Sequence, residues 1–253
     1  MMAAAGGNFS DEEFWKACAE LQQPAVAGKW ELLLETSGIS VYRLLEESTW
    51  LYKYKIFGVL KDCSPALLKE VYMDLGYRKQ WDQYVNELYE KECDGETLVY
   101  WQVEYPFPMY NRDYVYIREL RELDMEGRKI YVILAKSTSS SQFPERSGVI
   151  RVNQYQQSLA IESDGKGGSR EWSSQLLERP GRSLSQVPQE KIKENWDPYI
   201  CRLTSLRVPP PSDAQPSCQI SAFSGLHALP DVWLPGRLPF PLLPAQAAAS
   251  FYH

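Results

Sequence analysis

YPFPMYNRDYVY, at residues 105–116, joins two segments that have the alternation of strands. Its prolines and Asn111 are typical of a turn, and Tyr114 and Tyr116 share one face of the strand that follows. One face of the preceding strand carries Trp101, Val103 and Tyr105. A curved antiparallel sheet lined with such side chains can form an apolar cavity with a few polar groups, which is the usual makeup of a ligand site.

The segments around this stretch predict an α+β domain. Ser10 and Glu13 have the spacing of a helix capping box, and apolar residues recur at helical period from residue 14 to residue 21. Ser64 and Pro65 are typical of the start of a second helix, which we expect to run to residue 84. Strand patterns occupy residues 30–35, 39–44, 51–60, 98–105, 114–120, 129–137 and 149–161. Elements segregated in this order favour an antiparallel sheet packed by helices over a βαβ arrangement.

The composition excludes several classes of protein. With 44% hydrophobic and 13% aromatic residues among 253, the chain can form a core and is not disordered throughout. A formal net charge of −6 argues against a protein that binds nucleic acid by neutralising its phosphates. The two histidines, His227 and His253, lie near the C-terminus. The residues before them therefore hold no histidine base and no histidine metal ligand.

The cysteines and the N-terminal residues indicate in which cellular compartment we expect the protein. Five scattered cysteines without CxxC spacing favour free thiols in a reducing environment over a disulfide framework or a zinc site. The first residues show no secretory signal, and no run approaches the ~18 uninterrupted apolar residues that span a membrane. We therefore expect a soluble, cytoplasmic protein.

Composition changes abruptly near Ser169. Five of the 17 prolines precede residue 170, and the other 12 fall in the last 84 residues. Residues 1–169 carry 19 basic and 26 acidic groups, whereas residues 170–253 carry 8 and 7. Repeated prolines interrupt helices and are excluded from central strands. We expect an ordered domain at residues 1–169, followed by a divergent, Pro-rich and mostly disordered tail at residues 170–253.

Two more motifs complete a pattern with residues 105–116: YRKQWDQY at residues 77–84 and QYQQSLAIESDG at residues 154–165. Together they resemble the START (steroidogenic acute regulatory protein-related lipid transfer) domain family over about residues 8–169. The resemblance implies a helix-grip fold, in which a curved antiparallel sheet and its helices surround a lipid cavity. START domains continue with one or more strands and a C-terminal helix that covers the cavity. Residues 170–253 resemble neither, so we expect the fold to lack its last strands and its lid helix. Altered splicing or a shifted reading frame would explain such a tail.

Charged and aromatic residues of these motifs form the candidate site. Arg78 and Asp82 meet on one helix face, where spacing alone favours an exposed ion pair. Pattern alone makes the aromatic residues ordinary core filling, although tryptophan and tyrosine rings also attract quaternary ammonium groups. The resemblance implies a phosphatidylcholine site instead. Its residues would be Tyr72, Arg78 and Gln157 at the phosphate, Asp82 holding Arg78, and Trp101, Tyr114 and Tyr155 around the choline.

Two other stretches are read as structural. Asn111 suits a turn, and Arg112 and Asp113 open a strand as solvated or paired charges. GKGGS at residues 165–169 lacks the spacing and the Lys-Ser/Thr pair of a phosphate-binding loop, so it predicts a turn.

The function that the resemblance implies is carriage, not catalysis. Such a protein binds one phosphatidylcholine, contacts membranes transiently and moves the lipid between them, without catalytic residues, metal or cofactor. Because the C-terminal helix takes part in exchange in the family, we expect transfer by this chain to be impaired. Two alternatives stay open. An enzyme would have to use Tyr, Asp or Arg chemistry, since the domain has no histidine. A non-transferring regulatory or decoy isoform would act through protein interactions.

Overall fold

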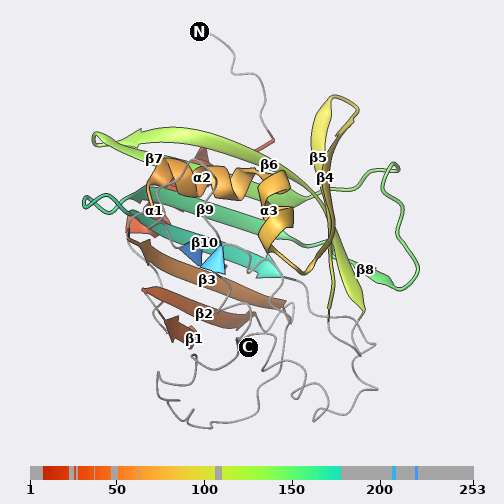
Figure 1. Ribbon diagram of the computed structural model, residues 1–253, viewed down its shortest axis with the longest axis horizontal. Coiled ribbons are helices and arrows are strands. Elements are labelled where there is room, and N and C mark those ends of the chain that lie inside the picture. Colours follow the sequence, from red (N-terminus) through yellow and green to blue (C-terminus); the bar gives the residue numbers. More distant parts are fainter. Residues whose placement is uncertain are drawn as a thin grey trace, which may run out of the picture.

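The computed structural model describes residues 8–22, 26, 28–36, 38–46, 51–61, 63–105, 110–177, 207–208 and 220–221. A ten-stranded sheet dominates them, with neighbouring strands in the order β1-β2-β3-β10-β9-β7-β6-β5-β4 (Figure 1). These neighbours all pair antiparallel, and β8 pairs in parallel with β6. The strands are β1 (Glu31–Thr36), β2 (Ile39–Glu46), β3 (Leu51–Leu60), β4 (Val85–Cys93), β5 (Glu96–Val103), β6 (Asn111–Met125), β7 (Arg128–Ser137), β8 (Val149–Arg151), β9 (Gln156–Ser163) and β10 (Ser169–Leu177).

Helices cover both faces of this sheet. α1 (Asp11–Gln22) packs on one face, and α2 (Pro65–Met73) and α3 (Leu75–Trp81) pack on the other (Figure 1). Because side chains alternate along a strand, Leu134 of β7 faces α1 while the adjacent Ile133 faces α2. We call these the α1 face and the α2 face. The predicted α+β architecture is confirmed.

A second group of buried side chains, rich in aromatic residues, lies on the α2 face nearer to β4 and β5. β4 and β5 run across the direction of β1, β2 and β3 (Figure 1), so the sheet is strongly twisted and curved. The buried side chains gathered there include Val41, Tyr54, Ile56, Val99, Trp101, Val103, Tyr105, Tyr114, Tyr116 and Tyr155. The predicted aromatic faces of the strands around residues 105–116 therefore meet in one cluster.

The long helix predicted from residue 65 to residue 84 is two helices that break at Asp74. The backbone N–H of Asp74 closes α2 on the Glu70 carbonyl, and its carboxylate accepts a 2.8 Å hydrogen bond from the Tyr77 N–H at the start of α3. An aspartate side chain competes in this way with the helical hydrogen-bond ladder. Helical periodicity on both sides of Asp74 concealed the break. The start was predicted correctly, since the Ser64 side chain caps the N–H of Leu67.

The ordered sheet extends past residue 169, where the sequence analysis ended the domain. β10 is a nine-residue strand between β3 and β9, paired with both along its length. On the α1 face its Trp172 is buried and donates to the Glu20 carboxylate at 3.0 Å. The expectation that the last strands are missing is therefore wrong for residues 169–177. The predicted disordered tail and the missing lid helix lie outside the described residues, apart from the short β11 (Arg207–Val208) and β12 (Ile220–Ser221).

Two other strand predictions differ from the structure. β4 was missed because most of its side chains are polar and exposed, as an edge strand allows. The single strand expected at residues 149–161 is β8 and β9, separated by residues 152–155. The predicted capping box at Ser10 and Glu13 forms, and residues 164–168 make the predicted turn.

Three buried cysteines, Cys18, Cys63 and Cys93, are free thiols, as predicted; Cys201 and Cys218 lie outside the described residues. No described helix combines the length and the apolar character that a membrane crossing requires.

Candidate functional site

The aromatic cluster on the α2 face is built by two paired strands and one loop. Trp101 of β5 lies directly opposite Tyr114 of β6, and their rings stack with centroids 4.9 Å apart. Tyr155 precedes β9 and packs edge-on against Tyr114 at 5.4 Å and against Tyr116 at 5.3 Å. All four side chains are buried. The arrangement combines aromatic ring faces with phenol groups, the two features that a quaternary ammonium group and a polar headgroup require.

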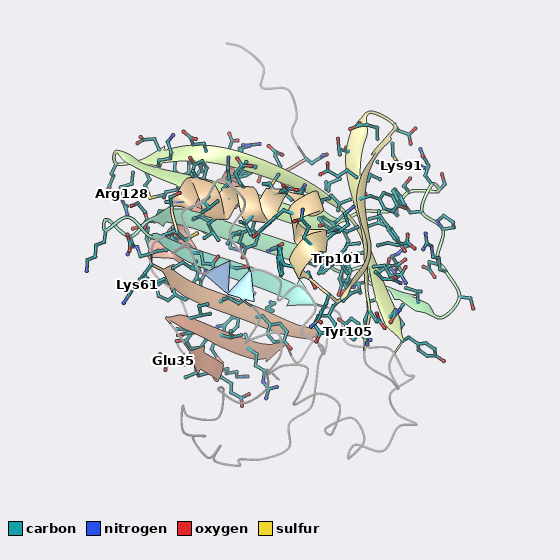
Figure 2. The ribbon with its side chains drawn as sticks, in the orientation of Figure 1. Glu35, Lys61, Lys91, Trp101, Tyr105 and Arg128 are labelled. Carbon is teal, nitrogen blue, oxygen red and sulfur yellow. The ribbon has the colours of Figure 1, made fainter. Side chains whose placement is uncertain are left out.

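α3 places a charged pair against these rings. Arg78 is 7% exposed and Asp82 is 5% exposed, and both the Nε and an Nη of Arg78 lie 3.2 Å from Asp82 Oδ2. The guanidinium carbon lies 4.3 Å from the Trp101 ring centroid (Figure 2 shows Trp101 beside α3). The i, i+4 pair is therefore buried, and the exposed ion pair that spacing alone favoured is wrong. A guanidinium on an indole face, with one carboxylate, leaves further N–H donors for a second anion.

The tyrosines around this guanidinium stay neutral. Burial raises the pKa of Tyr114 and Tyr155 well above the usual value, and it raises the pKa of Tyr116 as well. The positive charges of Arg118 and Arg78 act in the opposite direction on Tyr116 and Tyr155. Neutral phenols act as hydrogen-bond donors and acceptors at physiological pH. The site therefore combines the buried Arg78–Asp82 ion pair with neutral phenol groups.

Two further residues of the predicted set lie on the same face. Gln157 of β9 accepts a 2.7 Å hydrogen bond from the Tyr155 hydroxyl. Tyr72 of α2 donates from its hydroxyl to the Glu171 carboxyl of β10 at 3.3 Å. Sequence reasoning missed Glu171, because its strand was assigned to the tail.

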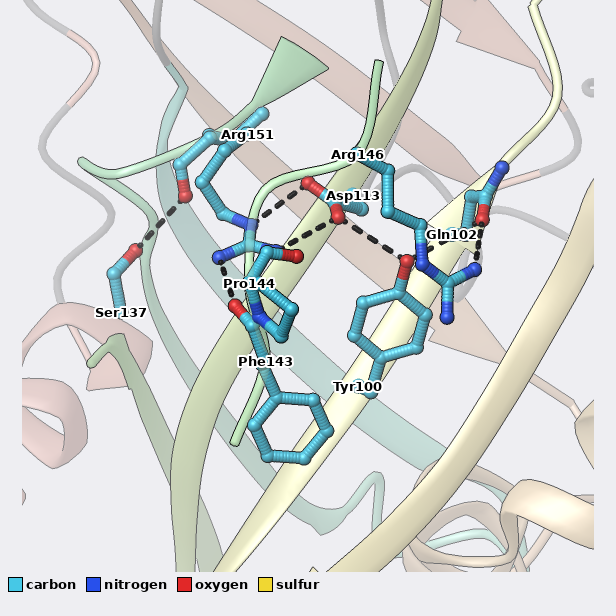
Figure 3. Close-up of polar contacts among 9 residues, drawn as sticks. Tyr100, Gln102, Asp113, Ser137, Phe143, Pro144, Arg146 and Arg151 are labelled. Carbon is cyan, nitrogen blue, oxygen red and sulfur yellow. Dashed lines mark hydrogen bonds and ion pairs between the residues drawn. The ribbon is translucent and has the colours of Figure 1, made fainter. Parts of the chain in front are cut away.

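A polar network on the α1 face fixes the strands that carry the cluster (Figure 3). Asp113, next to Tyr114 on β6, is 1% exposed and accepts 2.8 and 2.9 Å hydrogen bonds from Arg151. It also accepts from Tyr100, the neighbour of Trp101 on β5, at 3.1 Å. Asp113 is therefore a paired charge, one of the two outcomes expected for it. Breaking such a buried pair on one face would displace the rings on the other.

The START domain family model matches residues 14–187, which is more than half of the chain and includes every strand from β1 to β10.

This chain belongs to the START domain family.

Curated relatives agree with that assignment. The phosphatidylcholine transfer protein of Homo sapiens is 66% identical over 196 residues, which cover 77% of this chain and 89% of that protein. The protein of the same name from Bos taurus is 64% identical over the same shares. The human mitochondrial StAR-related lipid transfer protein 7 is 32% identical over 136 residues, covering 53% of this chain and 36% of that protein. Because the match to the human protein covers 77% of this chain, it includes residues beyond 169 at whichever residue it begins.

Solved structures show the same fold. Human STARD10 matches with a TM-score of 0.59 and 24% identity, covering 78% of each chain. Human StAR-related lipid transfer protein 5 matches with a TM-score of 0.59 and 13% identity, covering 77% of this chain and 92% of that one. At these sequence identities the comparison shows a common fold and nothing about function.

The structure thus gathers the predicted residues of this START domain on one face of its sheet. Arg78, Asp82, Trp101, Tyr114 and Tyr155 form one contiguous group through the contacts described above, and Gln157 joins it through Tyr155. Tyr72 lies on the same face, and its described partner is Glu171. Their roles towards a lipid stay predictions.

Two other residues of this START domain were not included in the predicted site. Tyr116 continues the alternation of Tyr114, and that pattern could have identified it as a wall of the cluster. Arg118 is two residues further along the same face and donates to the carbonyls of Tyr72 and Met73 at the end of α2. A cation at a helix C-terminus stabilises the helix, so Arg118 fixes α2 over the sheet.

A separate groove of about 490 Å³ lies between α1 and the sheet. It shares only Gln157 with the predicted residue set. Two of its lysines are already engaged, since Lys55 lies 3.9 Å from the Glu20 carboxylate and Lys136 donates to the Asn8 carbonyl at 2.6 Å. The groove does not belong to the predicted site of this START domain.

Proposed function

We propose that this START domain binds one phosphatidylcholine molecule and carries it between membranes. Relatives named phosphatidylcholine transfer protein match 89% of their length at 61–66% identity, which supports the ligand class. The observation that carries the proposal is the buried Arg78–Asp82 pair against Trp101, beside Tyr114 and Tyr155. A zwitterionic headgroup needs an anion site and a cation site a few ångströms apart, and this group of residues supplies both.

Charge balance supports a zwitterion over a charged lipid. Arg78 and Asp82 together are neutral, and burying a net charge among neutral phenols is costly. The phosphate of phosphatidylcholine would take the remaining N–H donors of Arg78, and the trimethylammonium group would take aromatic ring faces. Because the Arg78 guanidinium lies on Trp101, we infer that it shifts towards the phosphate when the choline takes its place on the ring.

Carriage follows from the cost of releasing the lipid. At about 0.8 kcal/mol for each buried CH₂, two acyl chains are not released to water at a useful rate. Exchange would therefore take place during transient contact with a membrane. We propose that the protein acts in the cytoplasm, without a metal, a cofactor or catalysis. Its relatives are named as transfer proteins, and this supports a carrier over an enzyme or a decoy.

Replacing Arg78 tests this function. Arg78→Ala should abolish co-purification of phosphatidylcholine in native mass spectrometry and transfer of labelled phosphatidylcholine between vesicles. Arg146→Ala is the matched control, because Arg146 is also paired with a carboxylate, Glu87, and lies over a ring, Tyr100, but not in the site. The control should retain binding, and the recovered lipid should be chemically intact. Retained binding by a folded Arg78→Ala protein would overturn the assignment.

The prediction of impaired transfer depends on residues outside the described part of the chain and stays a prediction. Vesicle transfer measured relative to the lipid content of the purified protein checks it. A full lipid load with slow transfer is the expected result.

A further inference from the structure

A row of polar side chains on β10 crosses the α2 face of the sheet. Ser169, Glu171 and Ser173 alternate along the strand, and each is at most 2% exposed. Their pairing partners on β3 and β9 at positions 171 and 173 are Gly58, Ile161, Ile56 and Leu159. Polar groups buried among such residues require hydrogen-bond partners. The Ser173 hydroxyl has none among the described residues.

The Glu171 carboxyl lies between the sheet and α2. Tyr72 donates to Glu171 Oε2 at 3.3 Å. On the neighbouring strand, a Cβ at Gly58 would lie 2.9 Å from Glu171 Oε1, so the glycine provides the space that this carboxyl occupies. Tyr72 is also one of the three residues expected at the lipid phosphate. Glu171 is therefore one hydrogen bond away from the proposed headgroup site.

The surroundings of Glu171 favour its neutral form. β3 and β9 present Gly58 and Ile161, α2 presents Tyr72, and no ion pair to Glu171 occurs within the described residues. Glu162, equally buried on the α1 face, differs because Arg128 and Arg170 pair with it. Burial raises the pKa of Glu171 to about 7, and the Tyr72 hydrogen bond acts in the opposite direction.

We propose that Glu171, as a neutral carboxylic acid, is a ligand-binding residue of this site and donates a hydrogen bond to a phosphate or ester oxygen of the phospholipid. The buried Ser173 hydroxyl supplies a second donor on the same strand. The inference rests on the proposed function, since it names a further contact to the same ligand. An ionised Glu171 would repel the phosphate, and no cation among the described residues pairs with Glu171 to offset its charge. Binding of the lipid is therefore coupled to the uptake of one proton.

The pH dependence of binding tests this coupling. Dihexanoyl phosphatidylcholine, used as a monomer, is titrated into the full chain from about pH 5.5 to about pH 8.5. For the wild type we expect a constant affinity below about pH 6 and a loss approaching tenfold for each pH unit above about pH 7.5. Glu171→Gln keeps a neutral donor of the same shape, so its affinity should change less than about twofold over this range. Glu162→Gln, the control on the opposite face, should follow the wild-type profile.

A second measurement needs no variant. Calorimetric titrations of the wild type in buffers of different ionisation enthalpy report the protons taken up with the ligand. We expect about half a proton near pH 7 and close to one proton near pH 8.5. Zero uptake at both values, or identical pH profiles for the wild type and Glu171→Gln, would overturn the role of Glu171 while the carrier function stands. Absence of binding by every variant at every pH would instead refute the proposed function.

Discussion

Two buried glutamates on neighbouring strands show how the surroundings of a carboxyl group decide its charge. Glu162 of β9 has two arginine partners on the α1 face, whereas Glu171 of β10 has a tyrosine on the α2 face. A buried carboxylate is stable only when cations or several hydrogen-bond donors compensate its charge. The first is therefore part of the scaffold, and the second is a group whose charge changes near neutral pH.

Glu171 should make the folded protein less stable as the pH rises. Its pKa is about 7 in the folded state and near 4.5 in the unfolded chain, so between these values the folded form holds a proton that the unfolded form has lost. The contribution of Glu171 to the free energy of unfolding is then highest below about pH 4.5 and falls by roughly 3 kcal/mol up to about pH 7.

Urea unfolding of the wild type and Glu171→Gln at several pH values checks this effect. Other groups change the stability in the opposite direction. The Ser10 backbone hydrogen bond, for example, lowers the pKa of Glu13, so Glu13 stabilises the folded protein as the pH rises. Such groups are present in both the wild type and Glu171→Gln. The difference between the two curves therefore isolates Glu171. A difference that does not vary with pH would contradict the prediction.

At the scale of elements, the position of Arg78 depends on a seven-residue helix. Asp74 caps the start of α3, where its carboxylate accepts from the Tyr77 N–H, and Asp82, the partner of Arg78, caps its end. So short a helix has little stability of its own. Its caps and its contact with Trp101 hold it in place.

Asp74→Ala should destabilise the protein by about 1 kcal/mol and weaken phosphatidylcholine binding, because it removes the cap that orients α3. Ser64→Ala removes a comparable cap at the start of α2, where the Leu67 N–H is bound. It should cause a similar loss of stability with little effect on binding. Chemical denaturation and vesicle binding measured on both variants separate the two effects. Equal losses of binding would show that α3 is not positioned by its cap.

At the scale of the molecule, β10 joins the two parts of the sheet. β1, β2 and β3 lie on one side of it, and β9, β7, β6, β5 and β4 lie on the other. Trp172 faces α1 and Glu171 faces α2, so the strand contacts both layers of helices. Without β10, two long strands would lose a partner and the sheet would divide.

A chain ended at residue 168 should therefore lose cooperative unfolding, whereas a chain ended at residue 187, the limit of the family match, should keep it. Thermal unfolding followed by near-ultraviolet circular dichroism compares the two. Cooperative unfolding of the 1–168 chain would show that β10 is dispensable.

Local patterns predicted much of the fold, and the resemblance to the START family predicted most of the candidate site. The aromatic residues Trp101, Tyr114 and Tyr155 could be placed because alternation sets the face of a strand. The same rule placed Tyr116 on the face of Tyr114, although the predicted site did not include it. Glu171 could not be found, since polar residues such as those of β10 carry no strand signal when their partners are unknown.

The sequence by itself determined the class of fold, the family, and the helix caps at Ser10 and Ser64, and through the family resemblance it indicated the residues of the candidate site. Each helix cap and each motif that carries the resemblance consists of residues close together in the chain. Only the tertiary structure decided that Arg78 and Asp82 are buried, that Asp74 ends one helix and starts another, and that residues 169–177 lie between β3 and β9. Burial and strand pairing are set by segments distant in sequence, and the pattern of a single segment does not reveal its partner.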